Sequence, residues 1–397
     1  MEIYVSLLIS FILALTLALY EVPIIVRIVK KLHLMDHPNE RSSAVSSIPT
    51  LGGIAIFISF ILASAIGLSR YELPEIRYIL PAITLIFFLG LTDDIVNVPP
   101  FKKIIVQIAV AAILIFLAKI RITNLHGLFG IWEIGEIPGF LITCFMIILI
   151  INSFNLMDGI DGLAAGITML VAFAFGSWFF ISGHYNYAIL SITLVGSLGG
   201  FFYYNVYGVQ NKIFMGDTGS LVLGTIISIL LIQFNEFNID QSQPYALAAA
   251  PAISFGILSY PLMDTFRVTM IRIFHLKTPF RADKNHFHHR LLILGLSHKQ
   301  ATFSIIGFNI LFILAVFNLN QQGTLKIMAY IIIAIIIIVM IPAFVISKRK
   351  LIKTDDPVQQ LLIPGAIEEP PGIKMWKSGL KRDESQVKNQ ITFLKDT

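Results

Sequence analysis

The chain has 397 residues, of which 56% are hydrophobic and only 13% are charged, and its formal net charge is +5. Its mean hydropathy of +0.80 excludes an ordinary water-soluble domain and is typical of a helical protein with many membrane spans. The single cysteine, Cys144, lies in an apolar stretch, which excludes a disulfide framework and a cysteine-based metal or redox centre. No nucleic-acid partner is expected.

About eleven apolar stretches are long enough, or nearly so, to cross a hydrocarbon core of about 30 Å as helices. In chain order they cover residues 4–27, 51–68, 76–92, 102–120, 138–154, 160–182, 185–206, 218–234, 245–268, 301–318 and 325–347. The fourth stretch is short, but the flanking Lys102, Lys103 and Lys119 can reach the membrane interfaces by snorkelling. The sequence therefore predicts an all-α polytopic membrane protein, with a membrane domain over residues 1–347.

Lysine and arginine residues set the expected orientation of these spans. Most of them fall in one set of alternate loops, which includes the segment from Arg267 to Lys299, and in the stretch after the last span. The positive-inside rule places this set in the cytoplasm, with the N-terminus outside and the C-terminus inside. We therefore expect a multi-pass protein of the inner (plasma) membrane, whose first span stays as an anchor.

The composition changes after the last span. Residues 348–397 are polar, contain several prolines and have nearly balanced charge. Such a segment cannot bury enough apolar surface to form a core. We expect it to be a flexible cytoplasmic tail.

Three acidic motifs fall at the expected cytoplasmic ends of spans. They are Gly90-Leu-Thr-Asp93-Asp94, Asn155-Leu-Met-Asp158-Gly-Ile-Asp161 and Phe214-Met-Gly-Asp217-Thr-Gly-Ser220. A bilayer strongly penalises ionisable groups, so acids at its edge are candidates for function. Several hard oxygen donors without cysteine suit Mg²⁺, or Mn²⁺ in its place, held partly by a substrate phosphate.

The segment from Arg267 to Lys299 adds arginines, lysines and histidines at the same membrane edge. These side chains can hold phosphate oxygens. Phosphoryl transfer needs both the acidic side chains that hold a metal ion and the basic side chains that hold phosphate oxygens, because positioning and charge neutralisation carry most of its catalysis. Zinc binding by His286, His288 and His289 is an alternative interpretation of the histidines.

The acidic motifs also have structural interpretations when each is taken alone. Asp93 and Asp94 could be solvated residues at the end of a span, and Asp217 could be an ordinary helix N-cap. Asp264 precedes Arg267 by three residues, a spacing that favours a local helical ion pair.

Two other classes of protein remain open. An ion-coupled transporter also keeps acids in membrane helices, but it should place them near the midplane and along both access routes. We find no internal repeat that would indicate inverted transporter halves. A non-catalytic scaffold would account for the spans but not for the acids beside a basic, histidine-rich segment.

Five ordered motifs resemble those of the polyprenyl-phosphate N-acetylhexosamine-1-phosphate transferases, membrane enzymes that move a sugar-1-phosphate from a UDP-sugar to a lipid phosphate. The resemblance covers roughly residues 1–320. It rests on Asp36-His-Pro-Asn-Glu-Arg41 with Pro49-Thr-Leu-Gly-Gly53, Leu91-Thr-Asp93-Asp94, Asn155 to Ala164, Phe214 to Ser220, and Asp283-Lys-Asn-His286-Phe-His288-His289-Arg290. One departure is Ser42-Ser43-Ala44 after the first motif, where the family commonly carries a histidine. We therefore assign no catalytic residue to that loop.

Within this family the chain resembles the branch that uses UDP-N-acetylglucosamine (UDP-GlcNAc) and undecaprenyl phosphate to begin an envelope glycan. The branch that transfers phospho-N-acetylmuramoyl-pentapeptide usually has three consecutive histidines followed by Phe-Glu. Here the run from His286 is His-Phe-His-His-Arg-Leu. Another UDP-N-acetylhexosamine, including that pentapeptide donor, remains the alternative.

The resemblance implies roles for individual residues. Asp217 and Asn155 match metal-binding positions, Phe214 an aromatic residue that stacks on uracil, and Asp161 a polar residue that hydrogen-bonds the uracil. The residues expected at the transferred phosphate, as catalytic acids or bases, are Asp93, Asp94 and Asp158, with Lys103 on the phosphate oxygens. Sugar and pyrophosphate recognition is expected from His286, His288, His289 and Arg290. A homodimer is an additional expectation.

Overall fold

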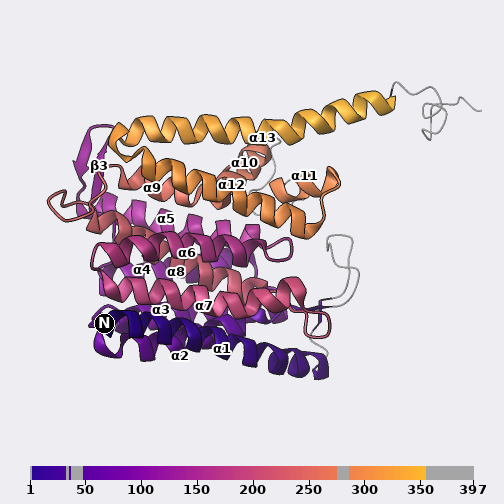
Figure 1. Cartoon of the computed structure of the whole chain (residues 1–397), viewed down its shortest axis with the longest axis horizontal. Helices are drawn as coiled ribbons and strands as arrows, with labels where there is room; N and C mark the ends of the chain where they lie inside the picture. The colour runs from indigo at the N-terminus through magenta and orange to yellow at the C-terminus, as the bar shows by residue number, and fades with distance from the viewer. Residues whose placement is uncertain (1, 33–34, 37–47, 275–285, 355–397) are drawn as a thin grey trace, which may run out of the picture. The chain divides into compact units, whose positions relative to one another are not determined.

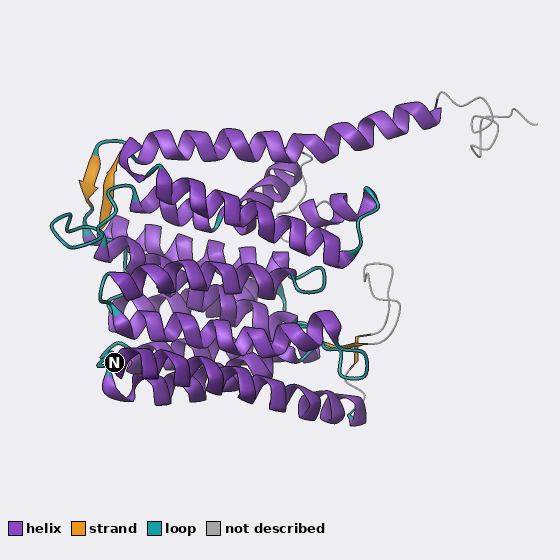
Figure 2. Ribbon diagram, in the orientation of Figure 1, coloured by secondary structure: helices purple, strands orange, loops and turns teal. Residues whose placement is uncertain are grey.

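The structure, a computed structural model, describes residues 2–32, 35–36, 48–274 and 286–354. The chain divides into two compact units, Met1–Met340 and Ile341–Thr397. The first unit is a bundle of helices with two short β-hairpins (Figures 1 and 2). Among the described residues, ten helices are long and apolar enough to cross a membrane. The prediction of an all-α polytopic membrane protein is confirmed, whereas the orientation of the bundle stays a prediction.

The first half of the bundle contains α1 (Glu2–Lys31), β1 (Met35–Asp36), β2 (Ile48–Pro49), α2 (Gly52–Gly67), η1 (Leu68–Arg70), α3 (Ile76–Val96), α4 (Pro100–Ala112) with a π-helical continuation η2 (Ile113–Leu117), β3 (Asn124–Leu128), β4 (Ile131–Glu133) and α5 (Glu136–Met157). The rest contains α6 (Leu163–Ile181), α7 (Tyr185–Tyr207), α8 (Gly216–Phe237), α9 (Ala250–Ile257), α10 (Ser259–Phe274), α11 (Phe287–Ile293), α12 (His298–Asn318), η3 (Asn320–Gln322) and α13 (Thr324–Thr354). Both hairpins, β1–β2 and β3–β4, are antiparallel.

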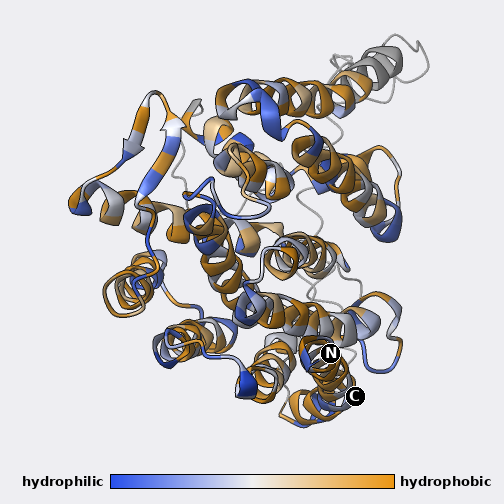
Figure 3. Ribbon diagram, turned by 60° about the vertical axis from the view of Figure 1, so that its left-hand side comes forward, coloured by the Kyte–Doolittle hydropathy of each residue, from blue (hydrophilic) through white to orange (hydrophobic). Residues whose placement is uncertain are grey.

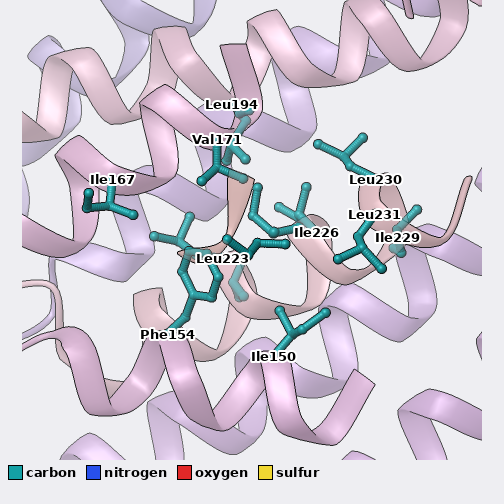
Figure 4. Packing of buried hydrophobic residues seen from close by; sticks show 14 of the residues in the cluster. Ile150, Phe154, Ile167, Val171, Leu194, Leu223, Ile226, Ile229, Leu230 and Leu231 are labelled. Carbon is teal, nitrogen blue, oxygen red and sulfur yellow. The ribbon is translucent and has the colours of Figure 1, made fainter. Parts of the chain in front are cut away.

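Helix α8 is the central element of the bundle. It packs against α2, α3, α5 and α6, and its apolar side chains meet those of α5, α6 and α7 in the core shown in Figure 4. Small residues permit this close packing: a Cβ on Gly224 would lie 2.5 Å from Cα of Ile151. Association of helices in a membrane depends on such close backbone approach rather than on the hydrophobic effect.

The ninth predicted span, 245–268, is divided into α9 and α10, which explains why ten rather than eleven single helices meet the length criterion. Pro261 lies in the first turn of α10, where its missing N–H is tolerated and where it favours a break just before. The buried Asn309 of α12 bonds to the backbone at the break: its Nδ2 donates to the Ile257 carbonyl at 3.1 Å and its Oδ1 accepts from the Tyr260 N–H at 3.3 Å. A neighbouring helix thus satisfies backbone groups that lipid could not.

Polar and apolar residues lie on different parts of the helices. Hydrophilic residues gather in the loops and at helix ends, while the middles of the helices are apolar (Figure 3). The β3–β4 hairpin lies at one end of the first unit, and α11 lies toward the other (Figure 1). We call the latter the site end, because α3 and α5 finish there and α4 and α8 begin there. Of the predicted tail, residues 348–354 continue α13, and residues 355–397 lie outside the described part of the chain.

Candidate active site

The residues just before α8 are hydrogen-bonded to the start of α2 and to the segment that precedes it. The Phe214 N–H donates to the Pro49 carbonyl at 2.7 Å, and the Phe214 carbonyl accepts from the Gly52 N–H at 2.9 Å. Helix α8 then starts at Gly216, whose φ of 73° lies in the left-handed region that favours glycine. Two motifs that are far apart in the sequence therefore meet, and Phe214 sits half-buried at their junction.

Asp94, near the end of α3, fixes the first turn of α8. Its Oδ1 accepts from the Asp217 N–H at 2.8 Å, and its Oδ2 accepts from the N–H and the hydroxyl of Thr218 at 2.9 and 2.5 Å. A carboxylate is favourable at a helix N-terminus, because the N–H groups of the first turn lack partners within the helix. The two helices approach closely at Gly90, where a Cβ would lie 2.6 Å from Cα of Thr218. Asp94 thus acts as an N-cap supplied by another helix.

Asp93, Lys103 and Asp217 form the centre of the candidate site. The Lys103 Nζ lies 2.9 Å from Asp217 Oδ2 and also contacts Asp93 Oδ2. Asp93 is buried, and its Oδ1 accepts from the Val98 N–H at 2.6 Å, which ties it to the turn between α3 and α4. One ammonium group therefore lies between two carboxylates, rather than snorkelling away to the membrane interface.

Asn155 orients Asp217 from the last turn of α5. Its Nδ2 donates to Asp217 Oδ1 at 2.8 Å and to Ser220 Oγ at 3.0 Å. Both oxygens of Asp217 therefore have partners, Asn155 on one and Lys103 on the other. The structure brings all the residues expected around the metal and the transferred phosphate into one cluster at the site end.

Asp158 directly follows α5, and the negative charges of Asp217 and Asp94 act on its carboxyl group. Burial, followed by the charges of Asp217 and Asp94, raises the pKa of Asp158 to about 7, although a hydrogen bond from the Gly216 backbone opposes the rise. A carboxyl group with this pKa can accept or release a proton near neutral pH.

Asp161 is held in a separate ion pair a short distance along the same loop. Its Oδ2 lies 2.6 Å from the Lys212 Nζ, and its backbone carbonyl accepts from the Thr302 hydroxyl at 2.8 Å. Asn205 of α7 fastens the loop, because its Oδ1 accepts from the Gly162 N–H and its Nδ2 donates to the Ile213 carbonyl. Asp161 and Phe214 therefore belong to two loops that one asparagine ties together.

The histidines lie on and just before α11. His286 and His288 are buried, and His288 packs on Gly159, where a Cβ would lie 2.5 Å from the imidazole Nε2. Burial, and the neighbouring His289 and His286, lower the pKa of His288 to about 3 despite the opposing charge of Asp264, so His288 is neutral. The ring centroid of His289 is 4.4 Å from that of His288, and Arg290 lies half-buried on the same helix.

Every candidate site residue named from the sequence lies in the described part of the chain, but parts of two motifs do not. Residues 37–47, which include His37 to Arg41 of the first motif, and residues 275–285, which include Asp283 to Asn285 of the fifth, lie outside the described residues. Thr218, Asn205 and Lys212 were missed, because nothing in their local sequence indicates their distant partners. Asp264 was expected to pair with Arg267, and their charged atoms do lie 3.7 Å apart. However, Asp264 also accepts hydrogen bonds from His286 and Phe287, which belong to residues 286–290, called the histidine segment below. The sequence feature that could have indicated this role is an acidic residue within an apolar stretch.

The donors of this cluster fit a hard divalent cation. Among the described residues, no three His, Cys, Asp or Glu side chains are grouped as a ready-made metal cage. Mg²⁺ commonly uses only one or two carboxylates and completes its shell with water and substrate phosphate oxygens. The carboxylates of Asp93 and Asp217, which hold the ammonium group of Lys103 between them in this structure, are the side chains that could serve as such ligands.

Comparisons with known proteins agree with this geometry. The family model described as glycosyl transferase family 4 matches residues 76–235, which include Asp93, Asn155 and Asp217. The probable undecaprenyl-phosphate N-acetylglucosaminyl 1-phosphate transferase of Bacillus subtilis (strain 168) is 30% identical over 343 residues, 86% of this chain and 92% of that protein. The undecaprenyl-phosphate alpha-N-acetylglucosaminyl 1-phosphate transferase of Escherichia coli (strain K12) is 29% identical over 279 residues, 69% of this chain and 73% of that protein.

The protein of the same name from Yersinia pestis is 30% identical over 274 residues, 68% of this chain and 73% of that protein. Sequence identity at this level to transferases, over most of both chains, excludes the transporter and scaffold interpretations. The chain therefore belongs to glycosyl transferase family 4, the polyprenyl-phosphate N-acetylhexosamine-1-phosphate transferases, and is a membrane enzyme that transfers a sugar-1-phosphate.

Proposed function

We propose that this enzyme transfers N-acetylglucosamine-1-phosphate from UDP-GlcNAc to undecaprenyl phosphate, releasing UMP and leaving undecaprenyl-pyrophosphate-GlcNAc. The observation that carries the proposal is the cluster of Asp93, Asp217 and Lys103 at one end of a membrane bundle. A lipid phosphate can reach such a site from the bilayer, while a nucleotide sugar reaches it from water. The names of the relatives in Bacillus subtilis and Escherichia coli support this acceptor and this sugar.

In the reaction, an oxygen of the lipid phosphate attacks the β-phosphorus of the UDP-sugar. A new P–O bond forms, the bond from the β-phosphorus to the bridging oxygen breaks, and that oxygen leaves with UMP. Charge accumulates on the phosphoryl oxygens, where a preorganised ammonium group is most effective in a site shielded from water. Lys103 is the side chain that we assign to this role.

Mg²⁺, with Mn²⁺ as a substitute, is the proposed cofactor. Asp217 would hold it, with Asp93 nearby, while Asn155 keeps the Asp217 carboxylate oriented through the 2.8 Å hydrogen bond. When bound, the ion neutralises the pyrophosphate of the donor. Ion and substrate phosphate together would draw Lys103 from the carboxylates to the phosphoryl oxygens.

We assign different tasks to the acids of the cluster. Asp94 is the positioning residue, since three hydrogen bonds to the start of α8 occupy its oxygens. Asp158, with its pKa of about 7, is the residue best suited to take a proton from the lipid phosphate, whose own second ionisation is close to pH 6. Asp161 and Phe214, on loops joined by Asn205, are the proposed uracil contacts.

The histidine segment is the proposed recognition element for the sugar and the pyrophosphate. It carries His286, His288, His289 and Arg290 and rests on the Asp158 loop through His288 and Gly159. We further propose that the site end faces the cytoplasm of the inner membrane, as the distribution of lysine and arginine predicts. The product would then begin an envelope glycan.

A panel of UDP-sugars tests this proposal. Purified enzyme with undecaprenyl phosphate and Mg²⁺ should release UMP fastest with UDP-GlcNAc. Equal or faster release with another UDP-N-acetylhexosamine would move the assignment to that donor. Absence of UMP release with every donor, from protein that retains its helical structure, would contradict the proposed reaction itself.

A further inference from the structure

Asp264 is a buried carboxylate that the reaction described above does not use. It lies on α10, beyond the break with α9, and only 2% of its surface is exposed. Its Oδ2 is 2.7 Å from Nδ1 of His286, and its Oδ1 accepts from the Phe287 N–H at 2.7 Å. Both partners belong to the histidine segment, so each oxygen of one carboxylate holds a separate point of that segment.

The nearby arginine does not account for this arrangement. The closest approach of Arg267 to Asp264 is 3.7 Å, between Nη2 and Oδ1. The two bonds from the histidine segment are shorter by a full ångström, and they come from residues that are far from Asp264 in the sequence. Hydrogen bonds to an ionised group are about twice as strong as those between neutral groups. The dominant partner of Asp264 is therefore the histidine segment.

The bond to Nδ1 determines how His286 can act. A carboxylate only accepts, so Nδ1 must carry a proton and donate it. In the neutral imidazole, Nε2 is then the unprotonated nitrogen and can accept a hydrogen bond. Carboxylates that contact a histidine in this manner fix both the tautomer and the orientation of its ring.

The effect of Asp264 extends to the loop that carries Asp158. The rings of His286 and His288 are parallel, with an interplanar angle of 6° and centroids 5.4 Å apart. His288 in turn packs on Gly159, which has no side chain to keep it away. A continuous set of contacts thus runs from Asp264 through His286 and His288 to the reactive cluster.

We propose that Asp264 is a positioning residue for donor recognition: it fixes the proton of His286 on Nδ1 and seats the histidine segment on the Asp158 loop. The part of this inference that concerns the donor rests on the proposed function. Asp264 touches no substrate in this scheme. It acts through His286, whose Nε2 is thereby presented as an acceptor for a hydroxyl or amide of the sugar.

Steady-state kinetics of Asp264→Asn tests the role in recognition. Because His286 and Phe287 contact different oxygens of Asp264, asparagine, which has an acceptor oxygen at only one of the two positions, cannot accept from both. We expect kcat/KM for UDP-GlcNAc to fall about 10- to 100-fold, the size of effect seen for residues that orient a metal-binding histidine. The KM for undecaprenyl phosphate should change less than about twofold. Asp240→Asn is the matched control, because Asp240 only caps an exposed turn through Ser242 and Gln243.

A double-mutant cycle separates positioning from a general structural role. If Asp264 acts through His286, adding Asp264→Asn to His286→Gln should lower kcat/KM by less than about threefold. An equal fall in both backgrounds would overturn the proposal. So would an Arg267→Gln variant that reproduces the fall in donor kcat/KM, because the ion pair with Arg267 would then account for the effect of Asp264.

Nitrogen NMR of histidine-labelled full-length enzyme provides a test that needs neither activity nor an Asp264 variant. The resonances of His286 are identified by their loss in His286→Gln. We expect a protonated Nδ1 and an unprotonated Nε2; either the opposite tautomer or an imidazolium protonated on both nitrogens would overturn the proposal. If the wild-type enzyme released no UMP, the proposed function would fail, while this spectrum would still show whether Nδ1 of His286 carries the proton that the contact with Asp264 requires.

Discussion

Replacing Asp94 tests how the start of α8 is held. Asp94→Ala removes three hydrogen bonds, two to backbone N–H groups and one to the Thr218 hydroxyl. Loss of a helix N-cap costs about 1–2 kcal/mol, and each buried donor left without a partner costs about 1–3 kcal/mol. Because Thr218 is fully buried and water cannot easily replace the carboxylate there, we expect a loss of about 3–5 kcal/mol in the free energy of unfolding.

Asp94→Asn separates this structural role from a role as catalytic base. An amide keeps one carbonyl oxygen, which can still accept from part of the first turn of α8, so the loss of stability should be about half that of Asp94→Ala. UMP release should fall in step with stability, because Asp217 is displaced when its turn is loosened.

Thermal unfolding in detergent and UMP release, measured on the same preparations, provide the assay. Asp240→Asn, in an exposed turn away from the candidate site, is the control for the chemical change itself. If Asp94→Asn unfolded at the wild-type temperature but lost more than about 1,000-fold in kcat, Asp94 would be a participant in the chemistry and the assignment as a positioning residue would be refuted.

Three further outcomes follow from the structure. Gly53→Ala should lower the unfolding temperature and UMP release together, since a Cβ there would overlap the Gly219 backbone of α8; wild-type stability would contradict the close approach of α2 and α8. Asn309→Leu should destabilise the enzyme by about 2–4 kcal/mol, because it leaves backbone groups at the α9–α10 break without partners; an unchanged unfolding temperature would show that they find other partners. The Asp158 pKa of about 7 exceeds its reference value of 3.8, so protonated Asp158 stabilises the fold below pH 4 and that stability is lost as the pH rises through 7. Asp158→Asn should therefore unfold at a higher temperature than wild type at pH 8, with the advantage shrinking toward pH 5, and a constant difference across this range would rule out the raised pKa.

The hydrophobic pattern was sufficient to predict the helical membrane fold, because nearly every span is a single uninterrupted apolar run. The exception was the stretch 245–268, which is as apolar as its neighbours but contains the α9–α10 break. The partner that stabilises the break, Asn309, lies on α12 and cannot be recognised from the local sequence around Pro261. The break could not be predicted, because its backbone groups are hydrogen-bonded by a side chain that is distant in the sequence.

The sequence predicted which residues meet at the candidate site, but not the hydrogen-bonding role of each one. The motifs containing Asp93, Asp94, Asn155 and Asp217 were expected to meet, and the structure brings them together. Which oxygen accepts from which N–H depends on the approach of α3 to α8, so the capping role of Asp94 could not be predicted. Likewise, the spacing of Asp264 and Arg267 indicated a local pair, whereas tertiary packing added His286 as the closer partner.

UMP release by Asp217→Asn, beside wild type, tests the central assignment most directly. Asp217 is the carboxylate on which Lys103 and Asn155 converge, and an amide removes the charge with little change in size. With Mg²⁺, UDP-GlcNAc and undecaprenyl phosphate, we predict rapid UMP release by wild type and a loss of at least about 100-fold in Asp217→Asn, with the unfolding temperature little changed. Wild-type activity in folded Asp217→Asn would contradict the proposed site.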